Sequence, residues 1–291
     1  MRTLANLKTH VLILAIAYLA ISFSVLAQDA ETNSTLKPAT ELTIAVASNF
    51  RHTLIALLKD YRQSPVLKDK VISASSGQLF SQIQNGAPFD IFFSADRQRP
   101  DRLEQLGLTD PHSRRTYAVG QLALWINPNF KHQLNKEQQA LSNLSLLKSL
   151  TAENLPKSTV LALANVKAAP YGYAAKTLLE NLQIWQLWQP LVVQAGNVAQ
   201  VYQYVESGNV SLALLSLAQL KLAQVPESEY ETVPAELYTA IDQQLVILQA
   251  AKNQIAAQAF VDYLKTPKAH SIISRSGYNL PYSDSSGKAL H

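Results

Sequence analysis

Residues 73–96 read SASSGQLFSQIQNGAPFDIFFSAD, and they predict a strand end near Ser73, an amphipathic helix over about residues 78–85 and a second strand over Phe89–Ser94. A Gly-Ala-Pro turn joins the helix to the second strand. The helix start is rich in Ser and Gly, so it offers unpaired backbone N–H groups, hydroxyls and the positive end of the helix dipole. This combination suits an anion.

Short apolar strands alternate with helical segments along most of the chain. Further strands are expected over Leu42–Ala47, Gln121–Ile126, Val160–Ala164, Val192–Ala195 and Val210–Leu215, a crossing segment over Thr239–Leu248, and helices over Pro170–Leu182, Val198–Glu206 and Ala251–Lys265. This alternation predicts an α/β protein with mostly parallel sheets, each covered by helices. Ligands of such sheets bind beyond the carboxyl ends of the strands.

Four loops at that edge start helices: Ser48-Asn49, Ser75-Ser76-Gly77, Pro170-Tyr171-Gly172 and Gly196-Asn197-Val198. Ser48 and Asn49 are expected to cap the helix that follows them. If the four loops converge, their amide and hydroxyl groups form a cage of neutral donors. Such donors hold an ionised acceptor strongly, so an oxyanion there needs no Lys or Arg. The alternative is that these residues are merely helix caps, because Ser and Asn are favoured N-caps.

The first residues indicate an export signal. Arg2 and Lys8 form a basic region, Val11–Ser22 is apolar, and Val25–Ala27 is a small-residue cleavage site. The alternative is a membrane anchor, but the apolar run is short of the ~20 residues that a spanning helix needs. Cleavage after Ala27 would lower the formal net charge from +4 to +2, because it removes two basic residues and no acidic one. That near-neutral balance gives no electrostatic footprint for nucleic acid.

The sequence contains no Cys, which excludes a lipid anchor on Cys, disulfides, thiolate metal sites and a cysteine nucleophile. Catalysis by serine has little support either. The sequence has no Gly-x-Ser-x-Gly motif, and its six His residues are scattered rather than paired with a Ser and an orienting acid.

Three stretches resemble the periplasmic molybdate-binding proteins of ABC importers. They are Ile44–Asn49, Ser75–Asp96 and Phe260–Pro267 with Gly277-Tyr278. The middle stretch is the most specific of the three, because it combines a Ser pair, Gln-Ile, Gly-Ala-Pro, Asp and Ser-Ala-Asp in order. The resemblance extends from Leu42 to about Pro281.

The resemblance implies an α/β fold of the type II periplasmic-binding class, with two α/β lobes joined by two crossing strands and the ligand in the cleft. Its expected parts are a signal peptide (1–27), a flexible leader (28–40), a first lobe (41–118 plus 238–283), a second lobe (119–237) and a tail (284–291).

The resemblance also implies the ligand-binding residues. Ser48 and Ser76 match the hydroxyl donors of the first lobe. Tyr171 and Val198 match the contacts from the second lobe, Val198 through its backbone N–H. Asn49 is a fifth expected contact, because one branch of the family pairs an Asn at this position with a Tyr at that of Tyr171. The sequence leaves open whether Tyr171 binds through its hydroxyl or its amide.

The expected function is that of an exported, monomeric receptor that captures molybdate or tungstate for the membrane subunits of an ABC importer. No catalytic residue, no cofactor, no nucleic-acid partner and no direct metal coordination are expected, because molybdenum would be bound as its oxyanion. The alternatives are a receptor for another oxyanion or a small organic acid, and a periplasmic serine hydrolase. A cytoplasmic oxyanion sensor of similar fold would conflict with the export signal.

Overall fold

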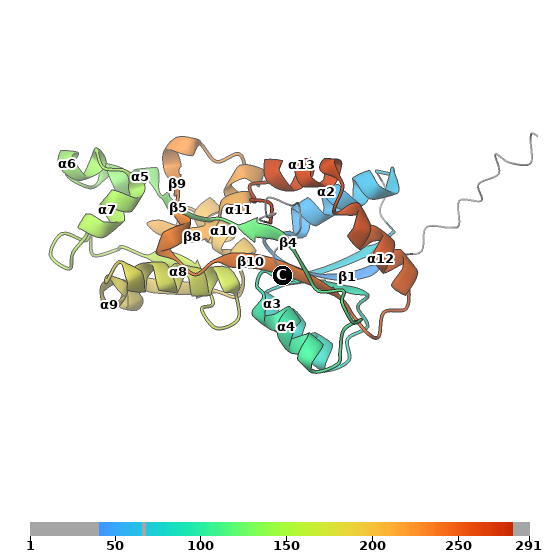
Figure 1. Ribbon diagram of the computed structural model, residues 1–291. Coiled ribbons are helices and arrows are strands. Elements are labelled where there is room, and N and C mark those ends of the chain that lie inside the picture. The colour runs from blue at the N-terminus through green and yellow to red at the C-terminus, as the bar shows by residue number, and fades with distance from the viewer. Residues whose placement is uncertain (1–40, 66–67, 282–291) are drawn as a thin grey trace, which may run out of the picture. The chain divides into compact units, whose positions relative to one another are not determined.

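The computed structural model describes residues 41–65 and 68–281, which form two five-stranded sheets covered by helices (Figure 1). The predicted signal peptide, leader and tail lie outside the described residues. The strand order is β2-β1-β3-β10-β4 in the first sheet and β7-β6-β8-β5-β9 in the second.

The strands of the first sheet are β1 (Thr43–Ala47), β2 (Lys70–Ala74), β3 (Ile91–Phe93), β4 (Arg115–Gly120) and β10 (Ile241–Ile247). Those of the second sheet are β5 (Leu122–Ile126), β6 (Leu161–Ala164), β7 (Val192–Ala195), β8 (Leu212–Ser216) and β9 (Tyr230–Thr232).

The helices are α2 (Arg51–Arg62), α3 (Ser76–Gln84), α4 (Gln98–Gln105), α5 (Pro128–His132), α6 (Lys136–Gln139), α7 (Asn143–Ser149), α8 (Pro170–Asn181), α9 (Trp185–Trp188), α10 (Val198–Glu206), α11 (Leu217–Leu222), α12 (Gln254–Tyr263) and α13 (Pro267–Arg275). Three short 3-10 helices are η1 (Gln189–Leu191), η2 (Glu227–Glu229) and η3 (Ala235–Leu237). We call the first sheet with α2, α3, α4, α12 and α13 the first lobe, and the second sheet with α5 to α11 the second lobe.

The prediction of mostly parallel sheets is wrong. In each sheet two strand pairs are parallel and two are antiparallel. Every antiparallel pair contains β5 or β10, the strands that the chain enters from the other sheet. Parallel neighbours in one sheet are joined by a crossover connection, usually a helix. The chain enters β5 and β10 directly from the other sheet instead, and these strands run antiparallel to their neighbours. The sequence pattern also gave no indication of β4, β9, α11 or α13.

The first sheet buries apolar side chains on both faces, as successive residues of β1 show. Ile44 and Val46 belong to a cluster with residues of α2, α12 and α13. Ala45, between them, belongs to a cluster with residues of α3 and α4. A sheet covered on both faces explains why its strands read as continuous apolar runs rather than alternating ones.

Two chain segments connect the lobes. Only Gln121 separates β4 of the first sheet from β5 of the second, and the chain returns from β9 through η3 into β10. Apolar packing continues across this junction, because Ile241 and Ala95 belong to the same buried cluster as the second sheet. The exact division of the chain into lobes at residues 118 and 237 stays a prediction.

Asp90, in the Gly-Ala-Pro-Phe-Asp turn before β3, fastens three segments of the first lobe. Its carboxylate accepts from the backbone N–H of Thr43 (2.7 Å) and of Lys252 (2.9 Å). Its own N–H donates to the Thr43 carbonyl at 2.8 Å, and the residue is 4% exposed. A buried carboxylate with backbone N–H partners of this kind cannot be lost without leaving those donors unpaired.

We therefore expect Asp90→Ala to lower the free energy of unfolding by about 3 kcal/mol, the range for breaking a buried charged network. Urea unfolding followed by circular dichroism would measure it. Glu153→Ala, at an exposed position, is the control and should change the free energy by less than about 0.5 kcal/mol. Equal, small changes in both variants would show that Asp90 does not fasten the fold.

Candidate functional site

The four loops singled out in the sequence meet at one small cavity between the lobes. Its volume is about 10 Å³, about the space that one water molecule requires. All five predicted ligand residues lie on its wall, and no lining residue carries a charge. The lining residues are Ala47, Ser48, Asn49, Ser75, Ser76, Ala95, Ala169, Pro170, Tyr171, Asn197 and Val198.

Of the five predicted ligand residues on this wall, four have a backbone N–H with no acceptor among the described residues: Asn49, Ser76, Tyr171 and Val198. The N–H of Asn197, on the same wall, has none either. Ser76 and Val198 are the first residues of α3 and α10, and Tyr171 is the second residue of α8 after Pro170. An N–H at the start of a helix has no partner within the helix. The cavity therefore collects unpaired donors from both lobes.

The helix caps leave these donors available. Ser75 caps α3 by accepting from the N–H of Gln78, and Asn197 caps α10 by accepting from the N–H groups of Ala199 (3.0 Å) and Gln200 (3.2 Å). Both caps use donors of the second or third helical residue. The N–H of the first residue stays unpaired in each helix. Capping thus uses other donors than those that face the cavity. The loops can therefore be helix caps and also form a cage of donors.

Ser76 adds a hydroxyl to the donors. Its Oγ accepts from the N–H of Ala95 at 2.9 Å, which fixes the oxygen and leaves the hydroxyl hydrogen available to a ligand. Ser48, at the end of β1, lies on the same wall and is anchored by its own N–H, which donates to the Ala74 carbonyl at 3.0 Å.

The expectation that Ser48 and Asn49 cap α2 is wrong. The N-cap of α2 is Phe50, and no side chain caps this helix. The Asn49 side chain instead reaches a distant strand, where its Nδ2 donates to Gln243 Oε1 (2.7 Å) and to Tyr278 Oη (3.3 Å). Both hydrogens of this amide are directed at protein atoms, so the donor that Asn49 presents to the cavity is its backbone N–H.

The two groups of Tyr171 that the sequence left open as ligands differ in their surroundings. Its hydroxyl accepts from Ser216 Oγ at 3.2 Å and lies against Gly120, where an added Cβ would be 2.4 Å from the phenol oxygen. The phenol thus packs at the junction of β4 and β5. The backbone N–H of Tyr171 is the group without a protein partner.

Buried tyrosines surround this junction. Two residues that form hydrogen bonds there, Tyr117 and Gln243, were not identified from the sequence. Tyr278 Oη donates to the Asn49 carbonyl at 2.7 Å, and Tyr117 Oη lies 3.1 Å from Gln243 Oε1. Burial raises the pKa of Tyr117, Tyr171 and Tyr278 above the usual tyrosine value. These phenols stay neutral at physiological pH. Gln243 and Tyr117 had no local signal, because their partners are far away in sequence.

A larger groove of about 750 Å³ lies beside the donors, between α3 and α4. It contains charged side chains, among them Arg99, Asp101 and Arg102, and it includes Ala168 of the second lobe. None of the five predicted ligand residues lines it, so the two hollows are distinct.

Two α/β lobes that bring neutral donors together in a small cavity define a solute-binding receptor. The chain belongs to the bacterial extracellular solute-binding protein family, whose model matches residues 42–279. This membership confirms the predicted fold class, with two α/β lobes joined by two crossing strands.

Two relatives are both named molybdate-binding protein ModA. The one from Azotobacter vinelandii is 37% identical over 243 residues, covering 83% of this chain and 91% of the relative. The one from Rhodobacter capsulatus is 30% identical and covers 82% and 88%.

Two solved structures extend this comparison. The periplasmic molybdate-binding protein of Azotobacter vinelandii matches with a TM-score of 0.72 and 32% identity, over 83% of this chain and all (100%) of that one. The sulfate-binding protein SubI from Mycobacterium tuberculosis matches with a TM-score of 0.63 over 83% of this chain and 87% of that one. At 11% identity the second match shows the fold alone.

Proposed function

We propose that this protein captures molybdate, and tungstate as its close analogue, and delivers it to the membrane subunits of an ABC importer. The observation that carries the proposal is the convergence of four unpaired backbone N–H groups from both lobes on one uncharged cavity. The names of the two relatives support the choice of anion.

Neutral donors suit a tetrahedral oxyanion for two reasons. Hydrogen bonds to an ionised acceptor are about twice as strong as neutral ones, and helix starts add a favourable dipole. A buried Lys or Arg would carry a desolvation penalty whenever the site is empty, which neutral donors avoid. In this proposal molybdenum stays bound to its own oxygens, and no cofactor and no direct metal–protein bond are needed.

The residues that line the cavity do not support catalysis by a serine nucleophile. A serine nucleophile needs a base within hydrogen-bond reach, and no His, Asp, Glu or Lys lines the cavity beside Ser48 and Ser76. We propose that the protein is a binding protein and not an enzyme, in keeping with its family.

We propose a periplasmic location. It rests on the predicted signal peptide, which lies outside the described residues, and on the family description. With no Cys in the sequence, a lipoprotein form is not proposed. In the described part of the chain, no helix is both long and apolar enough to cross a membrane. The proposed functional unit is a monomer without nucleic-acid partners.

Calorimetric titration with molybdate, tungstate, sulfate and phosphate tests the choice of anion. The cavity has room for about one water molecule, so the lobes must part to admit any of these anions. We expect molybdate and tungstate to bind and sulfate to bind far more weakly, because a donor spacing set by the larger anion is too wide for a smaller one to contact both lobes at once. Phosphate, which carries a proton near neutral pH, should also bind weakly, because the unpaired groups are donors and offer its hydroxyl no acceptor. Tight sulfate binding without molybdate binding would contradict the proposal.

Val198→Pro tests the backbone donor directly. Proline lacks the N–H, fits the first position of a helix and accepts an extended preceding residue, which Asn197 is (φ −157°, ψ 172°). The variant should fold and lose about 2 kcal/mol or more of molybdate binding free energy, the cost of an unmade hydrogen bond to a charged group.

Val198→Ala is the matched control, since it removes side-chain methyls and keeps the N–H. Its affinity should stay within about threefold of the wild type, a difference of roughly 0.6 kcal/mol. If the proline and alanine variants bound molybdate equally well, the Val198 N–H would not be a ligand.

A further inference from the structure

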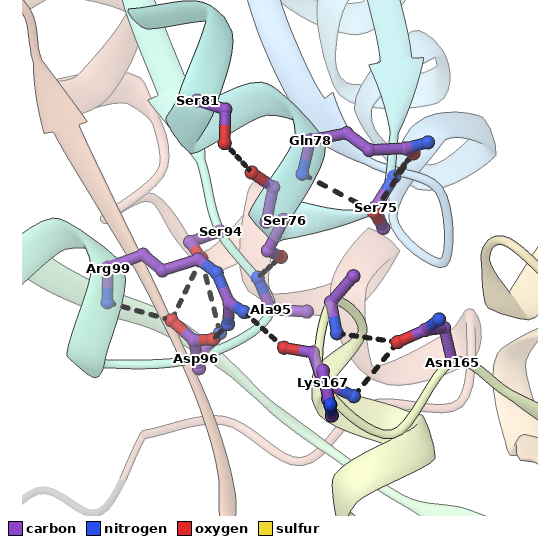
Figure 2. Close-up of polar contacts among 12 residues, drawn as sticks. Ser75, Ser76, Gln78, Ser81, Ser94, Ala95, Asp96, Arg99, Asn165 and Lys167 are labelled. Atoms are coloured by element: carbon purple, nitrogen blue, oxygen red, sulfur yellow. Dashed lines mark hydrogen bonds and ion pairs between the residues drawn. The ribbon is translucent and has the colours of Figure 1, made fainter. Parts of the chain in front are cut away.

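The Ser94-Ala95-Asp96 segment is prominent in the sequence, and ligand binding alone does not explain it. Its middle residue holds the Ser76 hydroxyl oxygen, since the Ala95 N–H donates to Ser76 Oγ at 2.9 Å (Figure 2). Its last residue, Asp96, has other partners, since its carboxylate accepts from Ser94 and Arg99. The segment therefore connects a ligand donor to a second group of polar contacts.

Asp96 organises an arginine. Its Oδ1 accepts from Ser94 Oγ (3.1 Å) and from the Arg99 N–H (3.0 Å), and its Oδ2 accepts from the Arg99 guanidinium. The side chains of Arg99 and Asp96 are 17% and 19% exposed. A planar guanidinium held in this way is oriented before it meets another partner, and its charge is compensated.

The free arm of Arg99 reaches the second lobe. Its Nη2 donates to the carbonyl of Lys167 at 3.1 Å, as Figure 2 shows. The next carbonyl, that of Ala168, accepts from the N–H of Gly77 at 3.0 Å. Gly77 allows this approach, because a Cβ there would lie 2.9 Å from the Ala168 oxygen. Two adjacent carbonyls of one loop are thus bound by the first lobe.

This loop leads directly into the ligand site. Asn165 Oδ1 accepts from the N–H groups of Lys167 (2.9 Å) and Ala168 (3.0 Å), so the loop is turned on itself and its carbonyls face outward. Pro170 and Tyr171 follow, and the unpaired Tyr171 N–H belongs to the cavity wall. Contacts that hold the Lys167 and Ala168 carbonyls therefore also hold the Tyr171 N–H in position.

We infer that Arg99 is a positioning residue for anion binding: held by Asp96, it clasps the 165–169 loop of the second lobe and keeps the lobes closed over the ligand. The inference rests on the proposed function. Arg99 does not line the cavity, so it acts through the loop. Because the clasp forms only when the lobes meet, it slows release of the anion more than it changes capture.

Arg99→Ala tests the clasp, and Arg102→Ala is the matched control. Arg102 lies on the same helix and lines the same groove, but it donates to Gln105 Oε1 (3.1 Å), within the first lobe. Stopped-flow displacement of molybdate should show dissociation about 10-fold faster in Arg99→Ala, the loss of a hydrogen bond from a charged donor. Association should change by less than about threefold, as is usual for mutants of one interface. Arg102→Ala should match the wild type in both rates.

Arg99→Lys separates the clasp from a general effect on stability. A lysine keeps a positive charge beside Asp96, but one ammonium lacks the second arm that reaches Lys167. This variant should unfold in urea at the wild-type midpoint and still release molybdate faster than the wild type. Wild-type dissociation from both Arg99 variants would overturn the inference.

A ligand-independent measurement keeps the clasp testable if molybdate is not the ligand. The sequence has no Cys, so Gln82→Cys in the first lobe and Gln186→Cys in the second, both exposed, accept spin labels uniquely. Double electron–electron resonance without anion and with molybdate should show longer separations in Arg99→Ala than in Arg102→Ala. A wild type that binds no molybdate would refute the proposed function. Identical distance distributions for the two arginine variants in both conditions would refute the clasp.

Discussion

An N–H group at the start of a helix has no acceptor within its own helix, and this constraint underlies the arrangement of the whole site. The N–H groups of Ser76 and Val198 open α3 and α10, and that of Tyr171 lies one residue inside α8. With Asn49 they meet on one wall without a protein acceptor among the described residues. Buried polar groups without partners are costly, so the closed arrangement favours an occupant that accepts from all of them.

The donors come from both lobes, so binding depends on how the lobes are held together. The junction of β4 and β5 supplies one constraint, where the Tyr171 phenol lies against Gly120 and Ser216. The hydrogen bond from Arg99 to the Lys167 carbonyl supplies another. Tyr171 lies between them: its side chain belongs to the junction, while its backbone N–H belongs to the cavity. In the proposed function, affinity therefore depends on lobe geometry as well as on the ligand contacts.

Local patterns were sufficient to predict much of the fold and which loops meet at the cavity. The helix over Val198–Glu206 has the predicted bounds, and the four loops meet as expected. The errors concern long-range pairing. Asn49 looks like a cap, but its side chain pairs with Gln243, 194 residues away. The sequence indicated mostly parallel sheets because local patterns do not encode strand direction. That direction depends on where β5 and β10 enter their sheets. The family resemblance, rather than spacing, selected individual ligand residues within the loops.

A crystal structure with molybdate bound tests the central claim most directly, namely that unpaired backbone N–H groups hold the anion. The account predicts molybdate oxygens at about 2.7–3.2 Å from the backbone nitrogens of Asn49, Ser76, Tyr171 and Val198, with the Tyr171 hydroxyl still bonded to Ser216. Molybdate held instead by the Tyr171 phenol or by a Lys or Arg side chain, with those four nitrogens out of reach, would contradict it.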